Sequence, residues 1–595
     1  MRFTWLSLPL LLSLLLGCAN APQLPALTRD REAESLEHAI AWPHASPRAI
    51  MVLASDYLAR NRARDGYATF SARAEAAPEQ SLFLALTGLF QARLAGEVPL
   101  LRRVAWVQDA AGKLDRAAVK GGLPRYLRGI VFADLPARFS RAQTAVDDLE
   151  WMLAHSAAFP PGLRRGAFRG LGKAYSTLGR SVDSEHAFAQ AGGRDTPPTL
   201  IDGSVSAAQG FRFAPRELVE VGHGVFVAQG YDFAEIAFIV TSAGVVAIDA
   251  GTTPATAAAA LAAFRARETA PITHVLITHA HWDHIGGLSA LVGPDTQVIA
   301  RCSFTEELAR VNSTQAPFRS FFGAGVKGPW QLAPSRCVSA REPLVVGDTH
   351  MILEPTRGGE TEDALLIQLP DAGILFVGDA FMPYFGAPFV AEGSVDGLLD
   401  TIAQIGALAP TKLIHGHAPL TLNFPVEVLP ALGEAITRTR DLTLEQIHAA
   451  RTQSETLARA ILPESLAQHP DAVVPFLLMR DNVINRLYQQ QSGYWKSDGE
   501  GMEVYSREEQ AAAFDLMAEG HDTAFVRAAQ SLHARGDYGM ALRIAELGLA
   551  AHPESTPLAS EKQRALEGLR ERYQYNPFKF LIYSDMARDE VAEVQ

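Results

Sequence analysis

One short stretch of the sequence decides the fold: Thr278-His279-Ala280-His281-Trp282-Asp283-His284. It brings three imidazoles and a carboxylate into one loop. The apolar run 274–278 leads into it and is typical of a buried strand. A loop at the carboxyl end of such a strand can direct all four side chains into one pocket. Imidazole and carboxylate are the groups that Zn²⁺ and similar ions take from proteins, so the stretch predicts a metal site.

Further histidine and acidic residues follow downstream, each beside a predicted strand. Glu360 lies in the turn 356–361, and Asp379 ends the apolar run Ile374-Leu375-Phe376-Val377-Gly378. A third apolar run leads into His415-Gly416-His417. These residues are therefore candidates for the same metal site.

The stretch 278–284 resembles the HxHxDH signature of the metallo-β-lactamase superfamily. The downstream motifs occur in the order that this superfamily has, and the run 237–251 resembles its opening hairpin and Asp-x-Gly turn. The resemblance implies an αββα sandwich. With the helical sequence on both sides, it predicts an α+β multidomain protein, in which the sandwich lies between an N-terminal helical-repeat region and a C-terminal all-α domain.

The resemblance also implies two metal ions per chain, which we expect to be zinc. His279, His281 and Glu360 would hold the first ion, and Asp379 would bridge the two. Each ligating histidine is expected to donate its other N–H to an acceptor elsewhere in the chain. Asp249 fits such a supporting role better than that of a ligand.

Asp283, His284 and His417 would hold the second ion. Asp283 is also the catalytic candidate, because it can orient a water molecule and accept its proton. His415 and His417 compete for one ligand position, and the glycine before His417 favours His417. Two ions lower the pKa of a shared water, so the expected nucleophile is metal-bound hydroxide.

Two features bear on the subfamily. Glu360 stands where most members carry a histidine, and the tail 475–590 resembles the helical dimerisation domain of linear primary-alkylsulfatases, which use an acidic ligand there. Against this, alkylsulfatases carry glutamate in place of Asp379 and a His/Asn-rich stretch in place of 381–384. The resemblance implies a homodimer through the C-terminal region.

Three function classes remain open. The first is hydrolysis of an alkyl sulfate ester, and the second is hydrolysis of another ester, thioester, lactone or phosphodiester. The third is a non-catalytic scaffold lipoprotein of the cell envelope. The aromatic loop 312–330, with Phe318, Phe321, Phe322 and Trp330, either accepts an apolar substrate tail or packs onto its own domain.

Composition excludes some partners. The chain has 595 residues, 48% hydrophobic and 20% charged, which suits a globular protein of about three or four domains. The net charge of −13 argues against a nucleic-acid partner. Cys302 and Cys337 are both within the predicted metal domain. Either a disulfide or two free buried thiols are compatible with their positions.

The N-terminus has the pattern of a lipoprotein signal. The leucine-rich run 6–16 is too short to span a bilayer and suits a signal peptide over 1–17. It ends in Leu15-Leu16-Gly17-Cys18, which resembles a bacterial lipobox and implies lipidation of Cys18. Because Ala19 follows instead of an aspartate, we expect a lipid anchor at the periplasmic face of the outer membrane.

Proline and glycine mark the other boundaries. Residues 18–47 are proline-containing and predict a tether, with a short helix near 31–40. Residues 48–192 have helical spacing, and Arg169 to Arg180 resembles a tetratricopeptide helix. Two roles stay open for this region, binding of a protein partner and simple packing. After a Gly/Pro linker, the metal domain is predicted over 200–425 and the C-terminal helical domain over 426–595.

Overall fold

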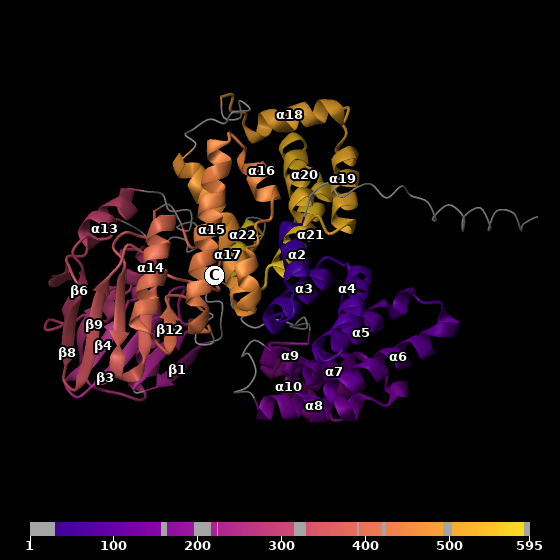
Figure 1. Ribbon diagram of the computed structural model, residues 1–595, viewed down its shortest axis with the longest axis horizontal. Coiled ribbons are helices and arrows are strands. Elements are labelled where there is room, and N and C mark those ends of the chain that lie inside the picture. The colour runs from indigo at the N-terminus through magenta and orange to yellow at the C-terminus, as the bar shows by residue number, and fades with distance from the viewer. Residues whose placement is uncertain are drawn as a thin grey trace, which may run out of the picture.

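The chain combines two β-sheets with two groups of helices. The computed structural model describes residues 30–155, 163–194, 216–222, 224–313, 329–389, 392–418, 424–491 and 502–587. The sheets lie on one side of the molecule, and the N-terminal and C-terminal helices lie together on the other (Figure 1). The architecture is therefore the predicted α+β multidomain one. Residues 1–29, with the predicted signal peptide and Cys18, are outside the described part of the chain.

The first sheet contains seven strands. They are β1 (Glu217–Gly222), β2 (Val225–Gln229), β3 (Ile236–Thr241), β4 (Gly244–Ile248), β5 (Ile272–Leu276), β6 (Gln297–Arg301) and β7 (Arg336–Val338). They follow one another across the sheet in chain order. The pairs from β1 to β4 are antiparallel, and the pairs from β4 to β7 are parallel.

The second sheet contains five strands. They are β8 (Glu342–Val346), β9 (Thr349–Pro355), β10 (Leu365–Leu369), β11 (Ile374–Gly378) and β12 (Lys412–His415). Their order is β12-β11-β10-β9-β8, and only β11 and β12 pair in parallel among them. The helices of this region are α11 (Pro254–Arg265), α12 (Trp282–Ile285), η5 (Leu288–Ala290), α13 (Phe304–Ser313), η7 (Pro370–Ala372) and α14 (Val395–Leu408).

Three apolar layers hold this region together. Between the sheets, buried side chains come from both, among them Leu276, Ile299, Ile367 and Phe376. On the outer face of the first sheet, Phe238 stacks on Phe264 of α11 with ring centroids 4.4 Å apart. On the outer face of the second sheet, Leu398 and Ile402 of α14 share one buried cluster with the strands. These layers form an αββα sandwich.

Several strands end at one edge of the sandwich. β4 ends before Asp249 and β5 before the loop 277–281, while β11 ends before Asp379 and β12 before His417. Gly378, with a φ of +51°, allows the turn after β11, and a Cβ there would lie 2.7 Å from Thr278. Parallel strands end at the same edge of a sheet, so the predicted site residues arrive together.

Helices before the sandwich pack in chain order. They are α2 (Arg31–Ala39), α3 (Pro47–Ala59), α4 (Ala63–Ala76), α5 (Ser81–Arg93), η1 (Leu94–Glu97), α6 (Leu100–Ala118), α7 (Gly122–Asp134), η2 (Ala137–Phe139), α8 (Ala142–Ala154), α9 (Leu163–Thr177) and α10 (Ser181–Ala191). Gly170 and Gly172 of α9 face Leu149 of α8 and Phe188 of α10, and a Cβ at either glycine would lie within 2.7 Å of that neighbour. Their absent side chains let these helices approach closely.

Helices after the sandwich reach the end of the described chain. They are η8 (Val426–Val428), α15 (Leu429–His448), α16 (Gln453–Ala458), η9 (Glu464–Gln468), η10 (Pro470–Ala472), α17 (Val473–Gln491), α18 (Arg507–Met517), α19 (Asp522–Ala534), α20 (Tyr538–Ala551), α21 (Thr556–Arg572) and α22 (Pro577–Met586). α17 and α21 contact α3, and one buried apolar cluster includes both helical groups. Among the described residues, no helix has both the length and the apolar character needed to cross a bilayer.

The described part of the segment predicted as a tether, residues 30–47, is folded. Residues 31–39 form α2, which was expected only as a short helix within the tether. Asp30 pairs with Arg572 at 2.9 Å, and Glu32 pairs with Lys579 at 2.6 Å. Residues 30–47 therefore belong to the helical body. Composition alone predicted a tether because the partners of these acids are distant in the chain.

The two cysteines of the sandwich are bonded. Cys302 directly follows β6, and Cys337 lies in the neighbouring β7; their sulfur atoms are 2.10 Å apart. Both residues are exposed, so the alternative of two buried free thiols is wrong.

Candidate metal centre

Seven buried side chains meet at the edge where the strands end. They form two groups, Asp283, His284, Asp379 and His417 in one and His279, His281 and Glu360 in the other. Within each group, the possible ligand atoms all lie within 4.8 Å of one another. These are the residues that the sequence motifs predict, and the division into groups matches the expected one. Their imidazole and carboxylate atoms make two candidate metal sites that fit a dinuclear centre.

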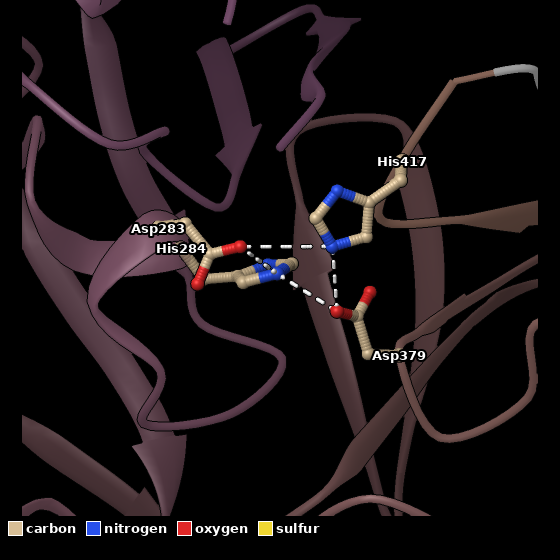
Figure 2. A group of neighbouring side chains, drawn as sticks. All are labelled: Asp283, His284, Asp379 and His417. Carbon is tan, nitrogen blue, oxygen red and sulfur yellow. Dashed lines mark hydrogen bonds and ion pairs between the residues drawn. The ribbon is translucent and has the colours of Figure 1, made fainter. Parts of the chain in front are cut away.

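The group of four converges on one carboxylate. Figure 2 shows the His417 ring and the His284 ring pointing at Asp379 from opposite sheets. The Asp379 Oδ2 atom lies 2.8 Å from His417 Nε2 and 3.3 Å from His284 Nε2. Asp283 Oδ2 lies 3.6 Å from His417 Nε2 and 3.7 Å from His284 Nε2. The four ligand atoms thus surround one small volume.

The group of three lies beside it. Glu360 Oε2 is 3.6 Å from both His279 Nε2 and His281 Nδ1. His279 Nε2 is also 4.0 Å from Asp379 Oδ2, so Asp379 faces both groups. That shared position agrees with the bridging role expected of Asp379.

Buried polar atoms without a hydrogen bond support the presence of cations. Among the buried side-chain atoms of the described residues that make no hydrogen bond, three are ligand atoms of the two groups: His279 Nε2, Glu360 Oε2 and Asp379 Oδ1. Leaving such atoms unsatisfied costs about 1–3 kcal/mol each or more. All three belong to the ligand groups, so bound cations would satisfy them, and the residues present fit a binuclear metal.

Three of the four ligand histidines are hydrogen-bonded through Nδ1, the ring nitrogen that faces away from the centre. His284 Nδ1 lies 2.8 Å from Asp249 Oδ2, and the same carboxylate accepts from the Thr278 backbone N–H at 2.8 Å. His417 Nδ1 lies 2.9 Å from the Phe233 carbonyl oxygen. His279 Nδ1 lies 3.1 Å from Thr278 Oγ1. Each ring therefore presents Nε2 to the centre, which is the arrangement expected of metal-binding histidines.

Asp249 supports a ligand histidine, the role that the sequence suggested for it. His415 also contacts a ligand without belonging to a ligand group itself. Asp249 adopts a φ of +57° just after β4, which turns its carboxylate under the His284 ring. His415 is in neither ligand group; its Nδ1 accepts from the His417 backbone N–H at 3.1 Å. At Gly416, a Cβ would collide with the Asp379 carboxylate and the His284 ring. The His-Gly-His spacing thus places His417, not His415, in the centre.

Burial and mutual charge shift the pKa values of these groups. Burial, together with His284 and His281, holds the pKa of His279 well below its usual value, so its Nε2 lone pair is free at neutral pH. Burial raises the pKa of Asp379, but His417 and His284 outweigh it and hold that pKa well below its usual range.

Burial lowers the pKa values of His281, His284 and His417, but the facing carboxylates outweigh it: the pKa of His281 rises to about 10, and the other two rise above their usual value. Burial raises the pKa of Glu360 well above its usual range. Metal binding at these four ligands therefore has to release protons.

A mostly apolar pocket opens onto the two groups. Its cavity volume is small, about 30 Å³. Its walls are aromatic and aliphatic except for the ligands and one additional acid: Phe233, His281, Trp282, Asp283, Val311, Glu360, Asp379, Phe385, Ala387, Glu392, His417, Phe578 and Leu581. Of the four rings named in the predicted aromatic loop 312–330, only Trp330 is among the described residues. Phe318, Phe321 and Phe322 are outside the described residues, and Trp330 stacks on Trp282 without lining the pocket.

Eight of the thirteen pocket residues were not predicted from the sequence, and three of them come from segments far from the ligand motifs or outside them. Phe578 and Leu581 belong to α22, near the end of the chain, and the Phe578 backbone N–H donates to the Phe385 carbonyl at 3.1 Å. Glu392 comes from the loop before α14 and carries a 4% exposed side chain. α22 resembled an alkylsulfatase segment in sequence, but nothing in its spacing indicated that it closes the site.

Known proteins resemble parts of this chain. Residues 232–417 match the model of the metallo-beta-lactamase superfamily. A hydroxyacylglutathione hydrolase from Rhodobacter capsulatus is 27% identical over 205 residues, which cover 33% of this chain and 67% of that protein. A linear primary-alkylsulfatase from Pseudomonas sp. (strain ATCC 19151) is 22% identical over 341 residues, or 51% of this chain and 63% of that protein.

The solved structures agree with the fold. A double mutant of the sec-alkyl sulfatase PisA1 superposes with a TM-score of 0.50 at 20% identity, covering 63% of this chain and 65% of that one. The sandwich of this chain is therefore a metallo-beta-lactamase domain, and the relatives named above are hydrolases.

Proposed function

We propose that this chain is a binuclear, metal-dependent hydrolase that cleaves an ester carrying an apolar group. The observation that carries the proposal is the pair of buried ligand groups sharing Asp379 at the base of an apolar pocket. The donor set suits zinc. A site that only stored a metal would not need an open, apolar-walled pocket beside it, so the arrangement argues against a purely structural scaffold.

The residues of the pocket have distinct roles in such a reaction. Two divalent ions, when bound, would lower the pKa of a water molecule and neutralise anionic charge on the substrate. Asp283 lines the pocket and is placed to orient that water and accept its proton. Asp249 holds the His284 ring in place, and Phe385 and Phe578 exclude bulk water from the reacting atoms.

Alkyl sulfate esters are the first candidate substrates. Glu360 stands in a ligand group where the resemblance to alkylsulfatases implies an acidic ligand. The linear primary-alkylsulfatase match covers 51% of this chain, more residues than the sandwich contains. The apolar walls would accept an alkyl chain while the charged ester group faces the ligands. Phe578 and Leu581 place the C-terminal helix in that wall.

A neutral carboxylate ester, thioester or lactone is the second candidate. Among the described residues that line the pocket, there is no arginine or lysine, whereas four carboxylates line it. Sulfate and phosphate groups are commonly recognised by such cations. A substrate without an anionic head would not need one.

A panel of substrates separates the candidates. Dodecyl sulfate, a long-chain carboxylate ester, a thioester, a lactone and a phosphodiester are offered to the full chain, with and without a chelator. We expect chelator-sensitive turnover of one class with an apolar chain. Turnover of a carboxylate ester, thioester, lactone or phosphodiester but not of dodecyl sulfate would reject the sulfatase assignment and keep the hydrolase. No chelator-sensitive turnover of any substrate would reject both.

The ligand count predicts two metal ions per chain. Seven ligands are present, and one zinc site takes three or four protein ligands. Elemental analysis of protein purified without chelator is expected to give about two zinc ions. A value of one that persists after dialysis against zinc would contradict the binuclear centre. Glu360→Ala should lower the count toward one, because it removes the carboxylate of the group of three.

A further inference from the structure

Glu392 is the pocket carboxylate that the proposed chemistry does not use. Its side chain is 4% exposed, and its Oε2 atom lies 3.5 Å from His281 Nε2. A buried carboxylate is costly unless a partner compensates its charge. The charge of Glu392 therefore has to be compensated by a neighbouring group, and the neighbour is His281, one of the proposed metal ligands.

His281 differs from the other three histidines of the centre. His279, His284 and His417 present Nε2 to the centre and are held through Nδ1. His281 does the reverse, since its Nδ1 is 3.6 Å from Glu360 Oε2 and its Nε2 faces Glu392. To offer the Nδ1 lone pair to a metal, the His281 ring must carry its proton on Nε2, and that N–H needs an acceptor.

The backbone around Glu392 is fixed by the C-terminal helices. Arg486 of α17 donates from Nη2 to the Glu392 carbonyl at 2.7 Å and to the Gly393 carbonyl at 2.6 Å. Gly393 has a φ of +80°, and a Cβ there would collide with the carbonyl oxygens of Gly359 and Glu360. The 392–393 turn therefore packs directly against the turn that contains Glu360, and the hydrogen bonds from Arg486 hold it in that position.

We propose that Glu392 is a positioning residue that accepts the His281 Nε2–H and so directs His281 Nδ1 to the first metal, and that Arg486 positions Glu392. The C-terminal helical region thereby sets the affinity of the first metal site. The proposal rests on the proposed ligation of a metal by His281. It does not depend on which ester is the substrate.

Stepwise Zn²⁺ binding to the full chain tests the role of Glu392, with a chromophoric chelator as competitor. Glu392→Ala should weaken the first site about 10- to 100-fold, the usual effect of losing such an acceptor. The second site should stay within about threefold of wild type, because its histidines keep their own acceptors. Glu392→Gln should recover most of the loss, because its amide oxygen can still accept from His281.

Two further variants complete the set. Arg486→Ala should weaken the first site by less than Glu392→Ala does, because the carboxylate remains but loses its fixed backbone. Asp396→Ala is the matched control: it removes a carboxylate from the same segment, 66% exposed and paired with Arg440, and should leave both sites unchanged. Thermal unfolding of the metal-free proteins identifies any variant that fails to fold.

The outcomes are distinguishable. An unchanged first site in Glu392→Ala, an equal loss at both sites, or a Glu392→Gln variant as weak as Glu392→Ala would overturn the proposal. If wild type itself bound no first metal, this proposal and the proposed function would both fail. Normal wild-type binding with an unaffected Glu392→Ala variant rejects the role of Glu392 alone.

Discussion

Asp283→Asn is expected to lower kcat by about 10²-fold or more even when the metal content is restored. Asp283 both belongs to the ligand group of four and lines the pocket, so it combines metal binding with proton transfer. Asparagine keeps the shape and a weak ligand oxygen but cannot accept a proton. General-base assistance alone contributes about 10²–10⁴-fold to rate, and saturating zinc isolates that part of the loss.

The measurement compares kcat and zinc content at increasing zinc concentration. Asp295→Asn provides the control, because it makes the same change at an exposed position of the same domain. Full recovery of kcat once two zinc ions are bound would show that Asp283 acts as a ligand only. A loss that persists at full occupancy supports its role in accepting the proton of water.

The metal ligands could be predicted because each one lies in a loop next to a strand, and the apolar runs of these strands are recognisable in the sequence. His279 to His284 follow β5, Asp379 follows β11, and His417 follows β12. Parallel strands deliver the residues of each sheet to one edge, and the face-to-face packing of the two sheets, which the superfamily resemblance implied, brings the two edges together. Glu360 departs most from the superfamily pattern, because most members carry a histidine at that position. Its turn nevertheless places it against His279 and His281.

The pocket walls could not be predicted in this way. Phe578, Leu581 and Glu392 reach the centre through contacts between regions distant in the chain, such as the bonds from Arg486 to the 392–393 turn. Hydrophobic spacing identifies which face of a helix is buried, but not what it is buried against. The same reason explains the tether prediction, since the partners of α2 and of Asp30 before it lie on α17, α21 and α22.

These distant contacts are ionic as well as apolar. Burial raises the pKa of Glu32, but Lys579 and Arg572 outweigh it and hold that pKa at about 2. Lys579 is on α22, one residue from Phe578 in the pocket wall. α2 therefore helps to fix the helix that closes the site. Since the carboxylate is favoured in the folded state, its contribution is complete above the ordinary carboxyl pKa and is lost as the pH falls toward about 2.

Glu32→Gln is expected to lower the free energy of unfolding by about 1–3 kcal/mol at neutral pH. The substitution removes the carboxylate that both Lys579 and the Tyr575 hydroxyl contact. Because the Lys579 side chain is 33% exposed, water compensates part of that loss. The double variant Glu32→Gln/Lys579→Met should recover much of the loss, because it removes both charges. Urea unfolding followed by circular dichroism measures the effect.

Glu464→Gln is the control for this pair. It breaks a contact of 3.2 Å with His38 in which the two side chains are 75% and 55% exposed, and exposed pairs contribute about 0–1 kcal/mol. Equal effects of Glu32→Gln and Glu464→Gln would mean that the Glu32–Lys579 pair does not stabilise the helical body. A large loss in Glu32→Gln that the double variant repairs would instead locate the cost in the unpaired Lys579. Because that lysine belongs to α22, a weakened apolar pocket wall should accompany the loss, visible as a higher KM for long-chain substrates.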